Sequence, residues 1–147
     1  MKNKVLMLHG PNLNMLGIRE PEHYGRQTLK EVNKLCEQVA IEHKLELAIF
    51  QSNDEAKIVE LIQSAMGRFD YIIINAAAFT HYSIAIRDAL KAVSIPFVEV
   101  HLSNIYARED FRKHSVLADL AVGCISGFGV YSYLLALKAV KGMVESK

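Results

Sequence analysis

Short apolar runs alternate with longer amphipathic segments along the chain. Five runs rich in β-branched and long apolar residues have the length of strands, at residues 5–9, 45–50, 71–75, 97–101 and 120–126. Between them, apolar residues return every three or four positions, which predicts helices over residues 29–43, 54–68, 84–93 and 130–144. Strand and helix therefore alternate.

This alternation predicts an α/β fold. Strands that are apolar on both faces, such as the Tyr-Ile-Ile-Ile run at 71–74, are typical of a parallel sheet covered on both sides. We predict a flavodoxin-like, doubly wound, five-stranded parallel sheet with helices on both faces, in a single domain over residues 1–147. The connection over residues 10–27 shows no obvious element of its own, and such long loops are often lids or binding loops.

Composition narrows the class of protein. A chain of 147 residues, 51% hydrophobic and 22% charged, suits one compact domain. Its 17 Lys+Arg and 16 Asp+Glu leave a formal charge of +1, so no global field favours nucleic acid or a membrane surface. No apolar run approaches the ~20 residues of a membrane span. Cys36 and Cys124 are too few for a secreted disulfide framework and are expected to be packing residues. We expect a cytoplasmic protein.

Polar residues collect where the predicted strands end. His9 closes the first strand and is followed by Asn12, Asn75 closes the third, and Glu99 and His101 lie in the fourth, ahead of Ser103. Open parallel sheets bind ligands beyond the carboxyl ends of their strands. We therefore expect these groups at one ligand-binding edge.

Glu99 and His101 are two positions apart in a strand that should be central, so their side chains share one buried face. A carboxylate that accepts the ring N–H of His101 would fix the tautomer and raise the basicity of the imidazole, as proton transfer requires. The alternative is a polar pair that only ends a strand.

Two further segments carry candidate chemistry. The long loop holds Arg19, Tyr24 and Arg26, and Tyr24 could act as a base only if nearby positive charge favours its phenolate. Taken singly, each of these residues is more typical of a solvated surface than of a catalytic site. After the third strand, Thr80 or Ser83 could cap a helix, and His81 is either a hydrogen-bond donor to substrate or a surface histidine. Asn53 or Asp54 could cap the preceding helix.

Other functions receive less support. The glycines form no dinucleotide fingerprint, and neither a phosphate-binding Gly-Lys-Ser/Thr loop nor a Gly-x-Ser-x-Gly elbow occurs. His9, His81, Glu99 and His101 could converge on a metal, which keeps a metal-dependent lyase or hydrolase open, although no compact ligand motif supports it. A non-enzymatic flavodoxin-like binding module is the other alternative, because a fold alone does not decide function.

Several motifs occur together in order: GPNLNMLG at 10–17, Arg19-Glu-Pro21 with Tyr24-Gly25, QSN at 51–53 with Glu55, Thr80-His81, EVHLSN at 99–104, and Arg108-Glu with Phe111-Arg112. In order and spacing they resemble the type II dehydroquinases across almost the whole chain. That resemblance implies a flavodoxin-like fold and the loss of water from 3-dehydroquinate to give 3-dehydroshikimate. It also implies that no cofactor and no metal are needed.

The resemblance also implies catalytic roles. Tyr24 would be the base, and Arg19, on a mobile lid, would lower its pKa. Asn12 would help to hold the water or the oxygen that stabilises an enolate. His101, oriented by Glu99, would protonate the departing hydroxyl.

Substrate contacts and assembly follow from the same resemblance. The substrate carboxylate would bind the backbone N–H groups of Leu102 and Ser103, and the ring hydroxyls would bind Asn75, His81 and Arg112. Asp88 would reach a neighbouring subunit's site in a trimer, with four trimers in a homododecamer. The chain departs from the family pattern at four places, namely Phe79, Tyr82, Ala56 and the pair Ala76-Ala77. None of these removes a proposed catalytic group.

Overall fold

Five parallel strands form one sheet in the order β2-β1-β3-β4-β5. Their bounds are β1 Asn3–His9, β2 Leu45–Gln51, β3 Tyr71–Asn75, β4 Phe97–His101 and β5 Gly123–Ser126. The computed structural model describes residues 2–18, 20–24 and 26–147, without the side chains of His23 and Tyr24. Because β1 lies between β2 and β3, the strand order reverses at β1, and the predicted doubly wound parallel sheet is confirmed.

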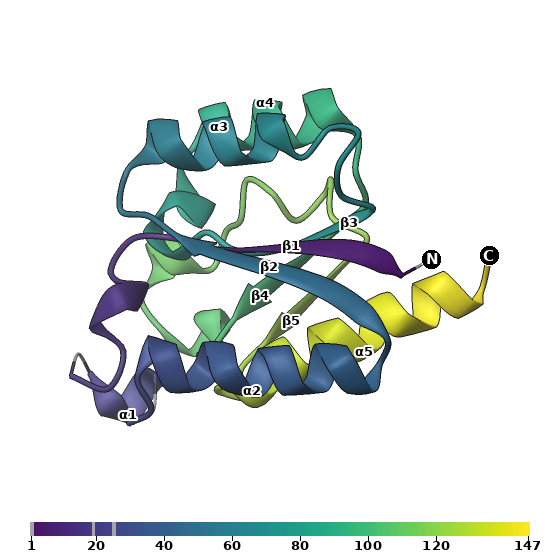
Figure 1. Cartoon of the computed structure of the whole chain (residues 1–147). Helices are drawn as coiled ribbons and strands as arrows, with labels where there is room; N and C mark the ends of the chain where they lie inside the picture. The colour runs from purple at the N-terminus through teal and green to yellow at the C-terminus, as the bar shows by residue number, and fades with distance from the viewer. Residues whose placement is uncertain (1, 19, 25) are drawn as a thin grey trace.

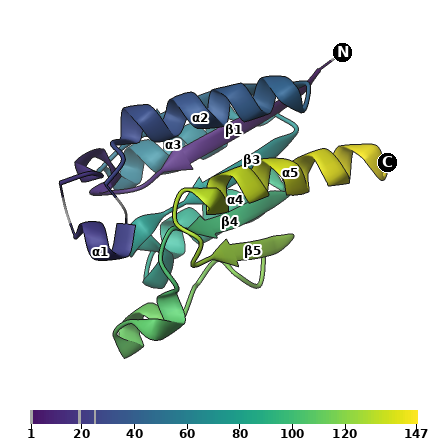
Figure 2. The same ribbon diagram turned by 90° about the horizontal axis from the view of Figure 1, so that it is seen from below.

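Helices cover both faces of the sheet, as predicted. Figure 1 shows α3 (Glu55–Ser64) and α4 (Ile84–Val93) on one face and α2 (Leu29–Glu42) and α5 (Tyr131–Glu145) on the other. The view in Figure 2 shows α2 and α5 running side by side. Within the described ranges, no helix is long and apolar enough to cross a membrane.

Polar side chains define where the helices begin. Thr28 and Glu31 form a reciprocal capping box at the start of α2. The Asp54 carboxylate accepts the N–H of Ala56 at the start of α3, and the Ser83 hydroxyl accepts the N–H of Ile86 at the start of α4. Of the paired cap predictions, Asp54 and Ser83 are therefore confirmed. Thr80 is buried and caps no helix.

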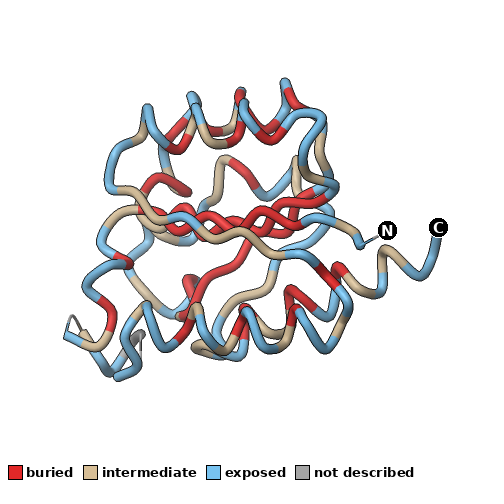
Figure 3. The backbone as a smooth tube through the Cα atoms, in the orientation of Figure 1, coloured by how far each residue is buried: buried red, intermediate tan, exposed pale blue. Residues whose placement is uncertain are grey.

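The core consists of two apolar layers, one on each side of the sheet. Every residue of β3 and β4 is buried, whereas the edge strands β2 and β5 are partly exposed (Figure 3). This difference follows from position, because central strands carry helices on both faces and neighbours on both edges. Glu99 and His101 of β4 are therefore enclosed, as the sequence predicted.

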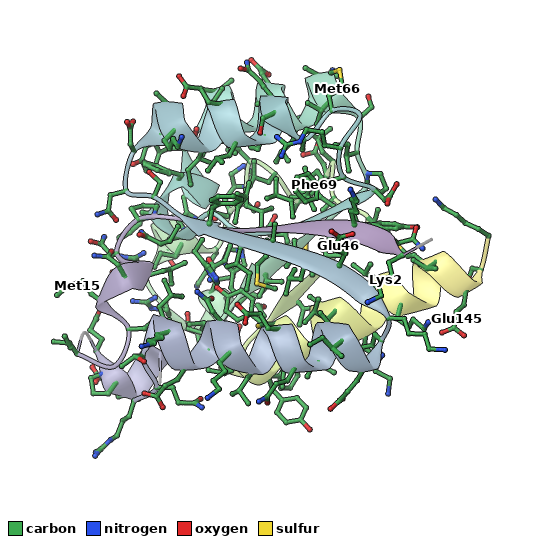
Figure 4. All side chains as sticks on the ribbon, in the orientation of Figure 1. Lys2, Met15, Glu46, Met66, Phe69 and Glu145 are labelled. Carbon is green, nitrogen blue, oxygen red and sulfur yellow. The ribbon has the colours of Figure 1, made fainter. Side chains whose placement is uncertain are left out.

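Three predictions about local structure were wrong. The last strand begins at Gly123 rather than residue 120, because the N–H groups of Leu120 and Ala121 bond back to the carbonyl of Leu117 in a turn. The connection over residues 10–27 contains two short helices, η1 (Leu13–Met15) and α1 (Pro21–Tyr24). Met15 marks this end of the molecule in Figure 4, on the side of the carboxyl ends of the strands. Cys124 is exposed rather than packed, while Cys36 is buried as expected.

Candidate active site

A cavity of ≈ 180 Å³ lies beyond the carboxyl ends of β1, β3 and β4. Short helices that follow the strands complete its wall: η1 after β1, η2 (Ala77–His81) after β3, and η3 (Ile105–Ala107) and η4 (Asp110–Arg112) after β4. Seven of the residues singled out in the sequence line it, namely Asn12, Asn75, His81, His101, Leu102, Ser103 and Arg112. The predicted ligand edge is thus where these side chains meet.

The ionisable side chains described in the lining of this cavity are all basic. Arg108, Arg112, His81 and His101 line it, and no Asp or Glu lines it among the residues that the structure describes. Backbone and side-chain amides and the Ser103 hydroxyl complete its polar surface. A cavity with this lining favours an anionic ligand that also carries hydroxyl or carbonyl groups.

Glu99 and His101 form the hydrogen bond that the sequence predicted. Nε2 of His101 lies 2.6 Å from Oε2 of Glu99, and both side chains are buried. An ionised carboxylate only accepts hydrogen bonds, so Nε2–H donates to Glu99, and Nδ1 is the ring nitrogen left for proton exchange. The hydrogen bond to Glu99 therefore fixes the orientation and the tautomer of the His101 ring.

His81 lies beside His101 with its ring nearly parallel, at a centroid distance of 6.4 Å. Its Nδ1–H donates to the carbonyl of His114 at 2.8 Å, which leaves Nε2 as an acceptor when the ring is neutral. Burial lowers the pKa of His81, and the hydrogen bond to His114 only partly opposes this effect. A neutral His81 can accept a hydrogen bond from a ligand hydroxyl through Nε2.

Asn75 is held by a buried hydrogen-bond network behind the cavity. Its Oδ1 accepts the N–H of Ala77 at 3.1 Å, and its Nδ2 donates to the hydroxyl of Tyr133 at 3.0 Å. Tyr133 in turn donates to Nδ1 of His9 at 2.8 Å, and Nε2–H of His9 donates to Oδ1 of Asn33 at 2.9 Å. His9 thus faces the core and does not line the cavity, contrary to its expected place at the ligand edge.

The turn after β1 places Asn12 at the cavity through contacts with the end of β2. Asn12 has a φ of 70°, and its N–H donates to Oδ1 of Asn53 at 2.9 Å. Nε2 of Gln51 donates to the carbonyl of Gly10 at 3.1 Å. A Cβ at Gly10 would lie 2.4 Å from the carbonyl oxygen of Ala76, so only glycine allows this approach of the turn to η2.

Arg108 is a cavity residue that the sequence analysis quoted in a motif but assigned no role. Its side chain is only 8% exposed, and one guanidinium nitrogen donates to the Ser103 hydroxyl at 3.4 Å. Its contacts with the carboxylates of Glu20 and Glu109 are longer, at 4.0 and 3.8 Å. Its buried charge makes Arg108 an anion-binding candidate alongside Arg112, which donates to Glu109 at 3.1 Å.

Not every predicted site residue reaches this cavity. Asp88 lies exposed on α4 and does not line it. Glu99 lies behind His101 and lines a second cavity instead. Arg19 lies outside the described residues, as does the side chain of Tyr24, whose backbone ends α1.

The metal hypothesis requires ligands that converge. His9 is bonded to Tyr133 and Asn33 in the core and Glu99 lies behind His101, so only His81 and His101 of the four candidate ligands line the cavity. Among the side chains that the structure describes, no group of three or more His, Cys, Asp and Glu is placed to hold a metal ion.

The second cavity has a volume of ≈ 690 Å³ and lies on the β5 side of His101. His101 and Ile105 line both cavities. Glu99 and Ser115 face the larger one, where Ser115 donates to Oε1 of Glu99 at 2.8 Å. The carboxylate is therefore hydrogen-bonded from both sides.

Known proteins resemble this chain over almost its whole length. The family model described as "Dehydroquinase class II" matches residues 3–141. The 3-dehydroquinate dehydratase of Hydrogenovibrio crunogenus is 59% identical over 92% of this chain and 94% of its own, and that of Geotalea daltonii is 57% identical over 93% and 95%. The crystal structure of a type II dehydroquinase from Butyrivibrio crossotus superposes with a TM-score of 0.93 at 41% identity, over 95% of this chain and 97% of its own. The chain belongs to the class II dehydroquinase family.

Proposed function

We propose that the 180 Å³ cavity is the site at which this protein removes water from 3-dehydroquinate to give 3-dehydroshikimate. Membership of the family makes the chain a hydro-lyase with 3-dehydroquinate dehydratase activity, a step of the shikimate pathway that leads to aromatic amino acids. The same reaction also serves quinate breakdown.

One observation supports this location above all others. The cavity is lined by two arginines and by His101, which Glu99 orients from behind, and none of its described lining residues is acidic. The substrate is a carboxylate with ring hydroxyls and a ketone, so it needs cationic and amide partners together with a proton donor. The residues that line the cavity supply all of these groups.

The reaction requires a base, an acid and donors for an oxyanion. Removal of a proton from the carbon next to the ketone places negative charge on the carbonyl oxygen, and the hydroxyl leaves only after protonation. In our proposal Tyr24 takes the carbon-bound proton, and Arg19 supplies the positive charge that favours its phenolate. Asn12 holds the water or oxygen at the enolate.

His101 supplies the proton for the leaving group. With Nε2–H bound to Glu99, the protonated ring gives the proton on Nδ1 to the departing hydroxyl, which leaves as water. The C–O bond breaks as the enolate collapses to the conjugated ketone. Tyr24 then holds the proton taken from carbon and His101 is neutral, so one proton transfer from Tyr24 to His101, direct or through solvent, restores both.

The substrate contacts are a further part of the proposal. The carboxylate binds at the carboxyl end of β4, against the backbone N–H groups of Leu102 and Ser103 and the Ser103 hydroxyl. Asn75, whose Oδ1 is occupied by the N–H of Ala77, contributes its Nδ2 group to a ring hydroxyl. His81 and Arg112 bind the remaining hydroxyls.

Assembly is a further part of the proposal. Asp88 lies exposed on α4, away from its own cavity, which suits a side chain that contacts a neighbouring subunit's site in a homododecamer built from trimers. Asp88→Ala should then raise the KM for substrate, and a sedimentation measurement of the wild-type protein should give the dodecamer mass. A monomer with full activity would refute this part.

The cytoplasm is the proposed location. Both cysteines are free thiols in the structure, Cys36 in the core and Cys124 on the surface, as suits a reducing compartment. Fractionation of cells that express the chain from its own start, with immunodetection, tests this. Recovery in a membrane or extracellular fraction would contradict it.

Replacement of the proposed acid and base tests the mechanism. Tyr24→Phe and His101→Asn should each lower kcat by about 10²- to 10⁴-fold, the usual contribution of general acid–base catalysis, with the fold intact by circular dichroism. Tyr106→Phe and His43→Asn change side chains that do not line the cavity and should leave kcat unchanged. Normal turnover by either site variant would remove that residue from the mechanism.

A further inference from the structure

Ser115 contacts the carboxylate that orients His101. It lies in the segment between η4 and β5, and its hydroxyl oxygen is 2.8 Å from Oε1 of Glu99. The other carboxylate oxygen, Oε2, is 2.6 Å from Nε2 of His101. Glu99 is 1% exposed, so these two partners replace the water that a carboxylate normally keeps.

The direction of the Ser115 hydrogen bond is fixed by its other partners. The backbone N–H groups of Leu117 and Ala118 both donate to the Ser115 oxygen, each at 3.1 Å. Two donated bonds fill the lone pairs of the hydroxyl, so its single hydrogen is directed to Glu99. Oε1 of Glu99 is therefore an acceptor.

We propose that Ser115 is a positioning residue for the dehydration, which keeps Glu99 ionised and aligned so that His101 exchanges its proton through Nδ1. This inference rests on the proposed function. The chain of donors runs from the backbone of Leu117 and Ala118 through Ser115 to Glu99, where it meets the donor from His101.

Ser115 acts without touching substrate. It lines the 690 Å³ cavity together with Glu99 and is absent from the lining of the 180 Å³ cavity. Its effect must therefore pass through Glu99 to His101. A residue of this kind should influence the catalytic step more than substrate binding.

Other ionisable groups lie near the Glu99–His101 pair, and they are the same in every Ser115 variant. Among the described residues, His81, Arg108 and Arg112 lie on the side of the 180 Å³ cavity, and Tyr106, Lys113, His114, Cys124 and the Arg87–Asp119 ion pair lie on the Ser115 side. None of these changes when Ser115 is replaced. A comparison among Ser115 variants therefore isolates a single hydrogen bond.

Loss of the hydroxyl should increase the affinity of the Glu99–His101 pair for a proton. A hydrogen bond to an ionised carboxylate favours the ionised form, and its removal from a buried site favours the protonated one. The proton is then released less readily from His101 to the leaving group. Because Glu99 and His101 interact strongly, this change in proton affinity belongs to the pair rather than to either residue alone.

The test compares Ser115→Ala with Ser115→Thr, which keeps the hydroxyl, and with Ser126→Ala, which removes a hydroxyl from the wall of the same cavity. Ser115→Ala should lower kcat about 10- to 100-fold with KM changed less than about threefold, as expected for loss of one hydrogen bond to a charged group. Ser115→Thr and Ser126→Ala should stay near wild type. If Ser115→Ala does not fold, Ser115→Cys, a weak donor of similar size, takes its place.

Two further readouts separate this role from a structural one. NMR titration of the His101 ring, assigned with His101→Asn, should show its midpoint at higher pH in Ser115→Ala than in the wild type. In a Glu99→Gln background, the same substitution should change kcat less than about threefold, because its target is gone.

An unshifted His101 titration, or an equal kcat loss in both backgrounds, would overturn the role of Ser115. A wild-type protein without turnover, but with the shifted titration in Ser115→Ala, would instead contradict the proposed function.

Discussion

The hydroxyl of Tyr133, on α5, lies 3.0 Å from Nδ2 of Asn75 at the end of β3. This hydrogen bond fixes the orientation of the Asn75 amide. Nδ2 faces Tyr133, and Oδ1 accepts the N–H of Ala77. The amide is therefore fixed before any ligand binds. A helix on one face of the sheet thus orients a candidate substrate-binding group at its carboxyl edge.

Tyr133→Phe should weaken both stability and substrate binding. The substitution leaves Nδ2 of Asn75 and Nδ1 of His9 without their buried partner, which should lower the free energy of unfolding by about 1–3 kcal/mol. KM should rise while kcat falls less, because in the proposed mechanism Asn75 holds substrate and moves no proton. Urea unfolding and steady-state kinetics measure these effects, with the exposed Tyr131→Phe as control. An unchanged KM would contradict the role of this contact.

His9 should make stability depend on pH. Burial lowers its pKa from 6.5 to about 4 in the folded protein, whereas the unfolded chain keeps the ordinary value. Between these values the unfolded state binds more protons, so stability is fully present above about pH 6.5 and is lost as pH falls to about 4. The loss should total about 3 kcal/mol.

The difference in the free energy of unfolding between the wild type and His9→Asn isolates this effect, because the other titrating groups contribute equally in both proteins. The free energy of unfolding, measured from pH 7 to pH 4.5, should fall more steeply in the wild type. Parallel curves for the two proteins would show that His9 does not titrate as proposed.

Gly10→Ala should disrupt the cavity. The added Cβ would lie 2.4 Å from the backbone oxygen of Ala76, so the turn and η2 must move apart, at a cost of about 1–3 kcal/mol or more. Asn12 and Asn75 flank this contact, so kcat/KM should fall as well. Gly142→Ala, at an exposed position of α5 with open space around it, should instead raise the free energy of unfolding by about 0.5–1 kcal/mol. Equal effects of the two substitutions on stability would be inconsistent with the close approach at Gly10.

Arg108→Gln should raise the KM for the anionic substrate about tenfold or more. Its guanidinium is largely buried at the cavity wall beside Ser103, where charge is poorly screened by salt. Arg68→Gln, an exposed site that does not line the cavity, serves as the matched control for loss of one positive charge. If both variants bind substrate equally well, Arg108 has no direct part in binding.

The sequence predicted those parts of the site that strand periodicity controls. Glu99 and His101 are two residues apart in a buried strand, so their shared face and their hydrogen bond follow from local geometry. Asn75 could be placed at the ligand edge for the same reason. The orientation of its amide could not, because it depends on Tyr133, which lies 58 residues away on α5.

Irregular backbone accounts for what the sequence did not predict. Arg108 and Ser115 lie between β4 and β5, where short 3-10 helices and turns carry no repeating apolar pattern. Their positions depend on how the chain folds back against β4, and no local spacing in the sequence predicts that course. Cys124 was expected to pack, but β5 is an edge strand and leaves this side chain exposed beside the larger cavity.

The most direct test of the account is a continuous ultraviolet assay of the purified protein with 3-dehydroquinate, with and without a chelator. The account predicts growth of the conjugated enone absorbance of 3-dehydroshikimate, at a rate that the chelator does not change and that His101→Asn lowers about 10²-fold or more. No growth from the folded protein would contradict the assigned reaction. Growth abolished by the chelator and restored by added metal would contradict the cofactor-free mechanism.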